Sequence, residues 1–283
     1  MKIFLLGDSF TCNLFAEKYD LIEKSKNDIW VQSDEIAKYL IKLNESDSNY
    51  TAKWFDDWLR EWGYEVYNFG KGGCSIEDII YQFSKIKDFD YNDGDRIIIN
   101  WTHPSRFNWI TYNLDCMYIH SNTESLHNLP KELFANQTVS REMSFFIDKE
   151  GCYLNENLLP FMKYIIEIHS KYNPIVWSPF ADVSDKFSNH KWFFSFIDEY
   201  SYSAFMSKTI PNWSMGPETS NVINDGHYGQ YGNYYIALLF DEIIKNNIGP
   251  NYNENRDFIF KNVLNRIKLE SKEFITKFDL NII

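Results

Sequence analysis

Four short apolar runs, separated by segments of helical periodicity, constrain the fold of this chain more than any other feature. They lie at 3–6, 64–69, 96–101 and 174–178. Each has the length of a buried strand and is followed closely by residues that favour turns, such as glycine, proline or small polar residues. Strands that alternate with amphipathic helices are typical of a parallel sheet covered by helices on both faces. The sequence therefore predicts an α/β fold, a three-layer α/β/α sandwich with a parallel, flavodoxin-like sheet.

The helical segments carry apolar residues at helical spacing. We expect Thr51 to cap a helix at 51–62 and Gly63 to end it, because a threonine hydroxyl accepts from free N–H groups and glycine tolerates the backbone that follows a helix. Further helices are expected at 30–43, 75–86, 157–172, 231–245 and 258–274. No linker divides the chain, so we expect one domain over 1–283, with insertions at about 105–151 and 180–217 and a helical tail from about 250.

The first apolar run ends at Gly7-Asp8-Ser9. A buried strand that stops in a tight turn projects one hydroxyl, which is where an α/β enzyme places a nucleophile. The same three residues are also ordinary turn chemistry. Because a serine hydroxyl is a poor nucleophile until a base takes its proton, Ser9 is a candidate that needs a base from elsewhere in the chain.

An aspartate and a histidine stand together far along the chain, at Asp225 and His227, just before the helix expected at 231–245. Only one residue separates them, so both side chains can point to the same side of an extended loop. His227 could then take the Ser9 proton while Asp225 holds the imidazole in the required tautomer. The alternative is that His227 is a loop histidine at the start of the next helix. Because Ser9 supplies a matching nucleophile, we prefer the interpretation that Ser9, His227 and Asp225 form a catalytic triad.

These motifs resemble those of the SGNH, or GDSL-type, hydrolases. In that family a Gly-Asp-Ser turn after the first strand carries the nucleophile, and an Asp and a His near the C-terminus complete the triad. The segment 68–75, Asn-Phe-Gly-Lys-Gly-Gly-Cys-Ser, is similar to the second block of the family. By its spacing, Gly73 matches the glycine whose backbone N–H serves the oxyanion hole. The resemblance implies that the backbone N–H groups of Ser9 and Gly73 hold the oxyanion, and that no cofactor or metal is needed.

The chain departs from the family in two places. Two residues separate the Asp from the His in the family pattern, against one here. The third block, Gly-x-Asn-Asp after the third strand, is missing. Alignment of that strand puts Thr102 at the glycine of the block, and we predict a substitute oxyanion donor from Thr102, His103 or Ser105, with Thr102 favoured. Asn100 lies inside the strand, where we expect its side chain to point into a layer of the fold.

Several residues near these motifs are candidate substrate contacts, namely Asp8, His103, Ser105 and Arg106. A guanidinium one short loop past the third strand could clamp a carboxylate or phosphate, with a structural salt bridge as the alternative for Arg106.

Aromatic residues make up 18% of the chain, more than a core of this size needs. Packing in the core is the expected place of most of these rings. We expect others, in the two insertions, to wall the cleft and to present their faces to a sugar. The rings in question are Phe180, Phe187, Trp192, Phe193, Phe194, Phe196, Tyr200, Tyr202, Phe205 and Trp213, with Trp109 and Tyr112 from the first insertion.

A net charge of -12 argues against a nucleic-acid partner or an anionic membrane. Cys12, Cys74, Cys116 and Cys152 lack metal-ligand spacing and are interpreted as reduced thiols. No apolar stretch reaches transmembrane length, and the first run is too short for a signal peptide. We therefore expect a cytoplasmic protein without a membrane or metal partner.

The sequence thus predicts a serine esterase that hydrolyses a small acyl ester, above all an acetyl ester, on a carbohydrate. Acyl transfer to a sugar hydroxyl through the same acyl-enzyme is the alternative among enzymes. A catalytically weak carbohydrate-binding module is the alternative from another class. A nucleotide-binding flavodoxin-like protein is disfavoured, because the turn at Ser9 lacks the run of glycine or hydroxyl residues that a phosphate site needs.

Overall fold

The structure is a computed structural model. It describes residues 1–13, 53–72, 74, 76–102, 106–110, 116–120, 166–167, 170–195, 228 and 230–278, with the strands at 106–110 and 116–120 described by their backbone.

A four-stranded, all-parallel sheet forms the centre of the described part of the chain. It consists of β1 (Lys2–Leu6), β2 (Glu65–Asn68), β3 (Arg96–Asn100) and β6 (Ile175–Trp177), in the order β2-β1-β3-β6. Strands β1, β3 and β6 are almost completely buried, as expected for strands that are covered on both faces. The prediction of a parallel sheet is confirmed.

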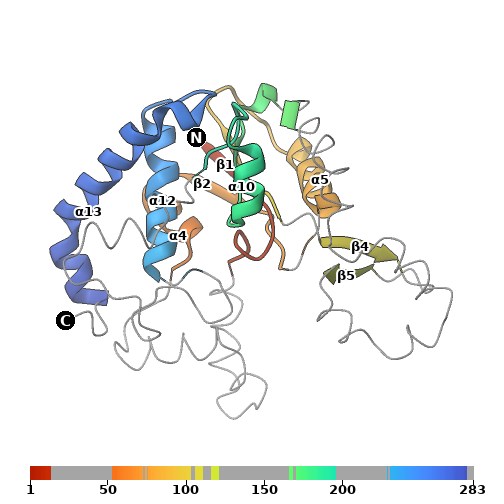
Figure 1. The fold of residues 1–283 in the computed structure, drawn as a ribbon, viewed down its shortest axis with the longest axis horizontal. Coiled ribbons are helices and arrows are strands. Elements are labelled where there is room, and N and C mark those ends of the chain that lie inside the picture. Colours follow the sequence, from red (N-terminus) through yellow and green to blue (C-terminus); the bar gives the residue numbers. More distant parts are fainter. Residues whose placement is uncertain are drawn as a thin grey trace, which may run out of the picture.

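Helices flank this sheet on both sides. The helices are α4 (Phe55–Glu61), α5 (Ile76–Lys85), α10 (Ala181–Phe187), α12 (Gln230–Lys245) and α13 (Arg256–Phe278). Figure 1 shows α4, α12 and α13 on one side of the sheet and α5 on the other. Short 3-10 turns at Ile86–Asp88, Ser170–Tyr172 and Tyr252–Asn255 complete the described elements. The arrangement is α/β and is consistent with a three-layer sandwich.

The helix expected at 51–62 begins later than predicted. α4 starts at Phe55, and its N-cap is Trp54 rather than Thr51, which lies outside the described residues. The Asp57 carboxylate accepts the backbone N–H of Trp54 at 2.9 Å, so an acidic residue in the first turn replaces the expected hydroxyl cap. The helix end is confirmed, because Gly63 has a φ of +90° and its N–H donates to the Arg60 carbonyl at 3.0 Å.

The first expected insertion contains an antiparallel hairpin that the sequence analysis left unassigned. β4 (Arg106–Ile110) pairs with β5 (Cys116–His120), and Arg106 stands opposite His120. Figure 1 shows this hairpin beside α5 and away from α12 and α13. Arg106 is therefore the first residue of a strand.

The second expected insertion begins with part of the core, which corrects the prediction of a cleft wall for four of its rings. Phe187, Trp192, Phe193 and Phe194 are buried. The Val176 N–H donates to the Trp192 carbonyl at 3.0 Å, and the Phe194 N–H donates to the Val176 carbonyl at 2.7 Å, so residues 192–194 run along the edge of β6. Packing beside the sheet places these rings in the interior. The expected rings from Phe196 to Trp213 lie outside the described residues.

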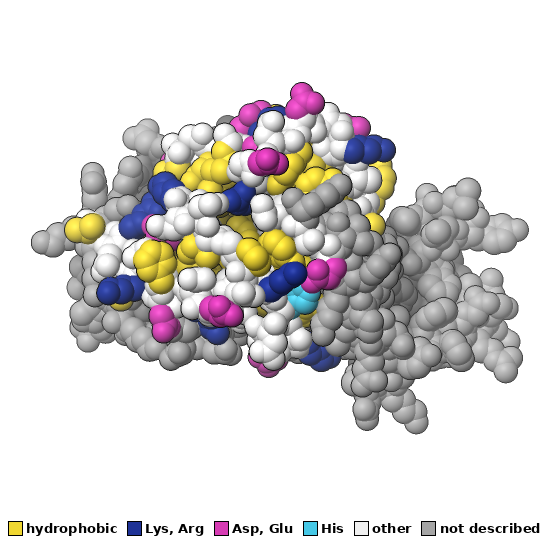
Figure 2. Space-filling model, turned by 90° about the horizontal axis from the view of Figure 1, so that it is seen from above, with side chains coloured by type: hydrophobic (Ala, Val, Ile, Leu, Met, Phe, Trp, Pro, Cys, Tyr) yellow, Lys and Arg dark blue, Asp and Glu magenta, His cyan; other side chains and the backbone are white. Residues whose placement is uncertain are grey.

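Charges of both signs are mixed on the surface of the described residues. The view from above in Figure 2 shows Lys and Arg side chains interspersed with Asp and Glu side chains and with hydrophobic ones. In the parts of the chain that could be searched, no helix is both long enough and apolar enough to cross a membrane.

Candidate active site

The turn that carries Ser9 lies at the carboxyl end of β1. The backbone N–H groups of Thr11 and Cys12 both donate to the Asp8 carbonyl at 2.9 Å, which closes a tight turn with Ser9 inside it. Ser9 is 8% exposed. The turn follows directly from the buried strand, as the sequence predicts, and residues 8–12 stand where ligands gather in open α/β sheets.

Glycine at position 7 is required by the shape of this turn. Gly7 has a φ of +150°, a conformation that residues with a side chain rarely adopt. A Cβ at Gly7 would lie 2.7 Å from Asn100 Cβ and 2.9 Å from the Asn100 carbonyl oxygen, and it would overlap Thr11 Oγ1. The turn thus packs directly against the end of β3.

Gly70 brings the loop after β2 against the other side of the turn. A Cβ at Gly70 would lie 2.5 Å from the Cys12 backbone nitrogen and 2.7 Å from the Thr11 carbonyl carbon. Both of these neighbours are backbone atoms and cannot move aside cheaply. The second motif, at 68–75, therefore reaches the Ser9 turn through Gly70.

The Asp8 carboxylate ties the turn to the end of β3. It accepts the Phe10 backbone N–H at 3.0 Å, the Asn100 side-chain amide at 2.6 Å and the Thr102 hydroxyl at 2.8 Å. Asp8, Asn100 and Thr102 have no exposed surface. We therefore assign Asp8 to the shape of the turn, rather than to contact with a substrate.

Asn100 differs from its expected place. We expected its side chain to point into a layer of the fold, but Asn100 is the last residue of β3 and its amide donates to Asp8, beside Ser9. The Thr102 hydroxyl, the favoured third oxyanion donor, also donates to Asp8. The Asn100 amide, at the end of β3, and the Thr102 hydroxyl, two residues later, thus both support the turn.

Gln82 is a site residue that the sequence analysis missed. Its Oε1 accepts the Gly7 N–H at 2.8 Å and its Nε2 donates to the Gly7 carbonyl at 3.1 Å, so one buried amide holds both polar groups of Gly7. The Lys71 backbone N–H and the Cys74 thiol also donate to the Gly7 carbonyl, each at 3.1 Å. Gln82 lies on α5, so this helix and the loop after β2 fix the residue two positions before Ser9.

Replacement of this amide tests its role in stability. Gln82→Leu should lower the free energy of unfolding by about 1–3 kcal/mol, because the Gly7 N–H loses its partner in a buried place. Urea denaturation followed by circular dichroism measures this. Ser84→Ala, which removes an exposed hydroxyl that donates to the Tyr81 carbonyl on the same helix, is the control and should change stability by less than about 0.5 kcal/mol. Equal losses in the two variants would refute the assigned role of Gln82.

α4 holds the far end of the turn. The Trp54 indole N–H donates to the Phe10 carbonyl at 3.2 Å, and the Asn68 side-chain amide bridges the Thr11 carbonyl at 2.8 Å and the Asp56 carboxylate at 3.0 Å. Burial raises the pKa of Asp56, and the neighbouring Asp57 raises it further. Hydrogen bonds therefore join the start of α4, the loop after β2 and the Ser9 turn into one unit.

Five residues of the remaining motifs lie outside the described residues, namely Asp225, His227, Gly73, His103 and Ser105. Of the segment that contains the predicted base, the structure describes Tyr228, the residue that follows His227.

Tyr228 lies against the Ser9 turn. Its ring centroid is 5.7 Å from that of Phe10, the residue that follows Ser9, in an edge-on arrangement. Asn233 of α12 fixes this position, since its amide donates to the Tyr228 carbonyl at 2.8 Å and its Oδ1 accepts the Phe55 N–H at 3.3 Å. Burial raises the pKa of the Tyr228 hydroxyl to about 12. The residue that follows His227 in the chain thus packs against the turn that carries Ser9.

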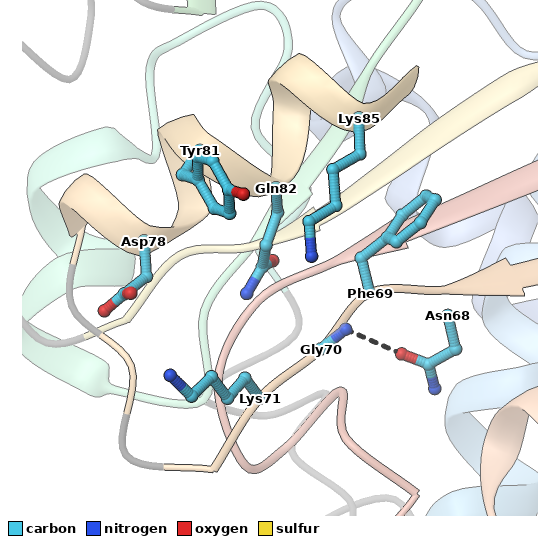
Figure 3. A pocket seen from close by; sticks show the side chains of 8 residues that line it. All are labelled: Asn68, Phe69, Gly70, Lys71, Asp78, Tyr81, Gln82 and Lys85. Atoms are coloured by element: carbon cyan, nitrogen blue, oxygen red, sulfur yellow. Dashed lines mark hydrogen bonds between the residues drawn. The ribbon is translucent and has the colours of Figure 1, made fainter. Parts of the chain in front are cut away.

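A pocket opens beside this unit, between the loop after β2 and one face of α5. Its volume is about 360 Å³, and it is lined by residues 68–71 and by Asp78, Tyr81, Gln82 and Lys85 (Figure 3). Lys71 and Gln82 belong both to the pocket and to the contacts on Gly7. The pocket therefore adjoins the candidate nucleophile turn.

No group of three or more possible metal-binding side chains occurs in the searched part of the chain. Cys12 and Cys74, the two cysteines with described side chains, are both buried. Comparison of the chain with family models, with curated proteins and with solved structures finds no match.

Proposed function

We propose that this protein is a serine esterase of the SGNH type that hydrolyses a small acyl ester, with an acetylated carbohydrate as the substrate class. The contact between Phe10 and Tyr228 carries the proposal. Phe10 follows Ser9 in the chain, and Tyr228 follows His227. Two motifs more than 200 residues apart in the sequence thus meet at their neighbouring residues, which is what a triad divided between these motifs requires.

The reaction uses three side chains in fixed roles. The Ser9 hydroxyl attacks the acyl carbon while His227 takes its proton, and the proton then passes to the leaving alcohol as the C–O bond breaks. A water molecule, deprotonated by His227, next attacks the acyl-enzyme and releases the acid and the free Ser9 hydroxyl. Asp225 holds the imidazole in the required tautomer. The net reaction consumes the ester and one water molecule and yields the acid and the alcohol.

The developing oxyanion is stabilised in this proposal by the backbone N–H groups of Ser9 and Gly73. Because the Thr102 hydroxyl donates to Asp8, we place the substitute third donor at His103 or Ser105. A donor aimed at the oxyanion is typically worth about 3 kcal/mol, roughly a hundredfold or more in rate, so this choice decides how fast the enzyme can be.

A second candidate function is a carbohydrate-binding module with weak catalysis. One observation favours it: the polar side chains at the end of β3, those of Asn100 and Thr102, both support Asp8. If no other residue supplies the missing donor, the acyl-enzyme forms slowly and binding dominates. An acyl-transfer reaction is the further alternative, since a sugar hydroxyl could replace water in the second step.

An activity-based label tests the proposal directly. A fluorophosphonate probe should modify Ser9, as mapped by mass spectrometry of the digested protein, and Ser9→Ala should abolish the labelling. Ser178→Ala is the matched control, because Ser178 is also a buried serine at the carboxyl end of a strand of the same sheet. Labelling that survives in Ser9→Ala and disappears in Ser178→Ala would place the nucleophile elsewhere.

A further inference from the structure

The pocket between α5 and the loop after β2 is held in a fixed relation to the nucleophile turn. The Lys71 backbone N–H and the Gln82 amide both bond to Gly7 at 3.1 Å or less, and Gly7 precedes Ser9 by two residues. Two residues of extended chain span at most about 7 Å. A group bound in the pocket is therefore close enough to be part of the molecule that reacts at Ser9.

The charge of this pocket is opposite to that of the whole chain. Two ammonium groups, those of Lys71 and Lys85, and one carboxylate, that of Asp78, belong to its lining, which gives a formal local charge of +1 in a chain of net charge -12. Figure 3 shows these three side chains around the opening, with the Gln82 amide between them. Such a pocket attracts a singly charged anion, while the rest of the protein repels one.

Aromatic surface stands next to the ammonium of Lys85. Its Nζ lies 5.2 Å from the ring centroid of Tyr81 and 6.0 Å from that of Phe69. Contact with these rings keeps the ammonium on their side of the pocket. Tyr81 is 65% exposed, which is unusual for a ring of this size, and Figure 3 shows it beside the opening. A ring with an attached anion can lie against Tyr81 and reach Lys85 at the same time.

We propose that this pocket binds a carboxylate on the alcohol part of the ester substrate, an inference that rests on the proposed esterase function. A carboxylate carries one negative charge, which matches the local charge of +1, whereas a phosphate monoester carries between one and two. The substrate class is then an acyl ester whose leaving alcohol is a ring that bears a carboxylate.

Three matched esters test the proposal: 4-carboxyphenyl acetate, phenyl acetate and 4-(trimethylammonio)phenyl acetate. The measured quantity is the ratio of kcat/KM for the anionic ester to kcat/KM for the neutral ester. Lys85→Met should lower this ratio by about threefold to tenfold, the effect of removing one partly exposed charge next to a ligand charge. The ratio for the cationic ester should rise. Because ratios are compared between variants, the intrinsic reactivity of each ester cancels.

Lys87→Met is the control, since Lys87 lies on the adjoining 3-10 turn, is exposed and does not line the pocket. It removes the same charge from the whole protein and should leave the ratio within about twofold of wild type. A ratio that changes equally in both lysine variants, or in neither, would overturn the proposal and leave the esterase function standing.

Direct binding separates this proposal from the esterase function. Saturation-transfer NMR on Ser9→Ala should show benzoate bound in preference to benzamide, and the preference should disappear in Ser9→Ala/Lys85→Met. If wild type hydrolyses none of the three esters but benzoate binding follows Lys85, the esterase function fails and the carboxylate site remains. If esters are hydrolysed and benzoate shows no preference, the carboxylate site fails alone.

Discussion

Ser9→Ala is expected to abolish hydrolysis of p-nitrophenyl acetate, with a loss in kcat of about a thousandfold or more. His227→Ala should lose nearly as much, because the members of a triad act as a unit and the serine cannot attack without its base. Asp225→Asn should cost less, on the order of tenfold to a thousandfold, where another group can partly hold the imidazole. Steady-state kinetics of the three variants measure these losses.

The double variant Ser9→Ala/His227→Ala gives the sharper result. If the two residues act together, its rate should equal that of either single variant, whereas independent roles would multiply the losses. For wild type, kcat/KM should rise with pH through an apparent pKa near that of an imidazole, because the free base is the active form. Ser178→Ala serves again as the control and should retain the wild-type rate. A Ser9→Ala variant with full activity would end the catalytic assignment.

The central sheet could be predicted because its strands are buried on both faces. Runs such as Ile97-Ile98-Ile99 are unbroken stretches of branched side chains, and few structures other than a buried parallel strand use them. Gly63 marked the end of α4 because glycine adopts the positive φ found there without a steric cost. Local chemistry was sufficient in both places.

The start of α4 and the fate of residues 192–194 depended on contacts that local patterns do not contain. Several residues before the first helical turn could serve as a cap, and the sequence does not say that Trp54 uses the Asp57 carboxylate. The aromatic cluster at 192–194 is typical of a ligand cleft as well as of a core. The cluster is buried because its backbone pairs with Val176 of β6, and a local sequence pattern does not contain this pairing.

Within the site, the sequence identified the turn but missed its supports. Asn100 was excluded by the alternation of side chains along a strand, a rule that fails at the last residue, where the chain leaves the sheet. Gln82 did leave a signal: it lies among the buried residues Ile79, Phe83 and Ile86, so a polar side chain interrupts the apolar face of α5. A polar residue in such a position must have a buried partner, and here that partner is Gly7.

Gly7→Ala is expected to lower the free energy of unfolding by about 3 kcal/mol or more and to reduce labelling of Ser9. Two separate costs add at this position. A residue with a side chain pays roughly 1–2 kcal/mol for a strained positive φ, and a methyl group forced into packed atoms costs a further 1–3 kcal/mol. The new Cβ would stand 2.7 Å from Asn100 Cβ, on the residue that donates to Asp8, so relief of the clash would shift the turn itself.

Two other glycines separate these costs. Gly63 has a φ of +90° and nothing within 4 Å of its Cβ position, so Gly63→Ala carries the strain alone and should cost about 1–2 kcal/mol with the Ser9 label unchanged. Gly94 has neither a positive φ nor a close neighbour, and Gly94→Ala should stay within about 0.5 kcal/mol of wild type. Urea denaturation of the three variants gives the order of stability. If Gly7→Ala were no less stable than Gly63→Ala and kept full labelling, the close packing of the Ser9 turn against β3 would not be needed for its shape.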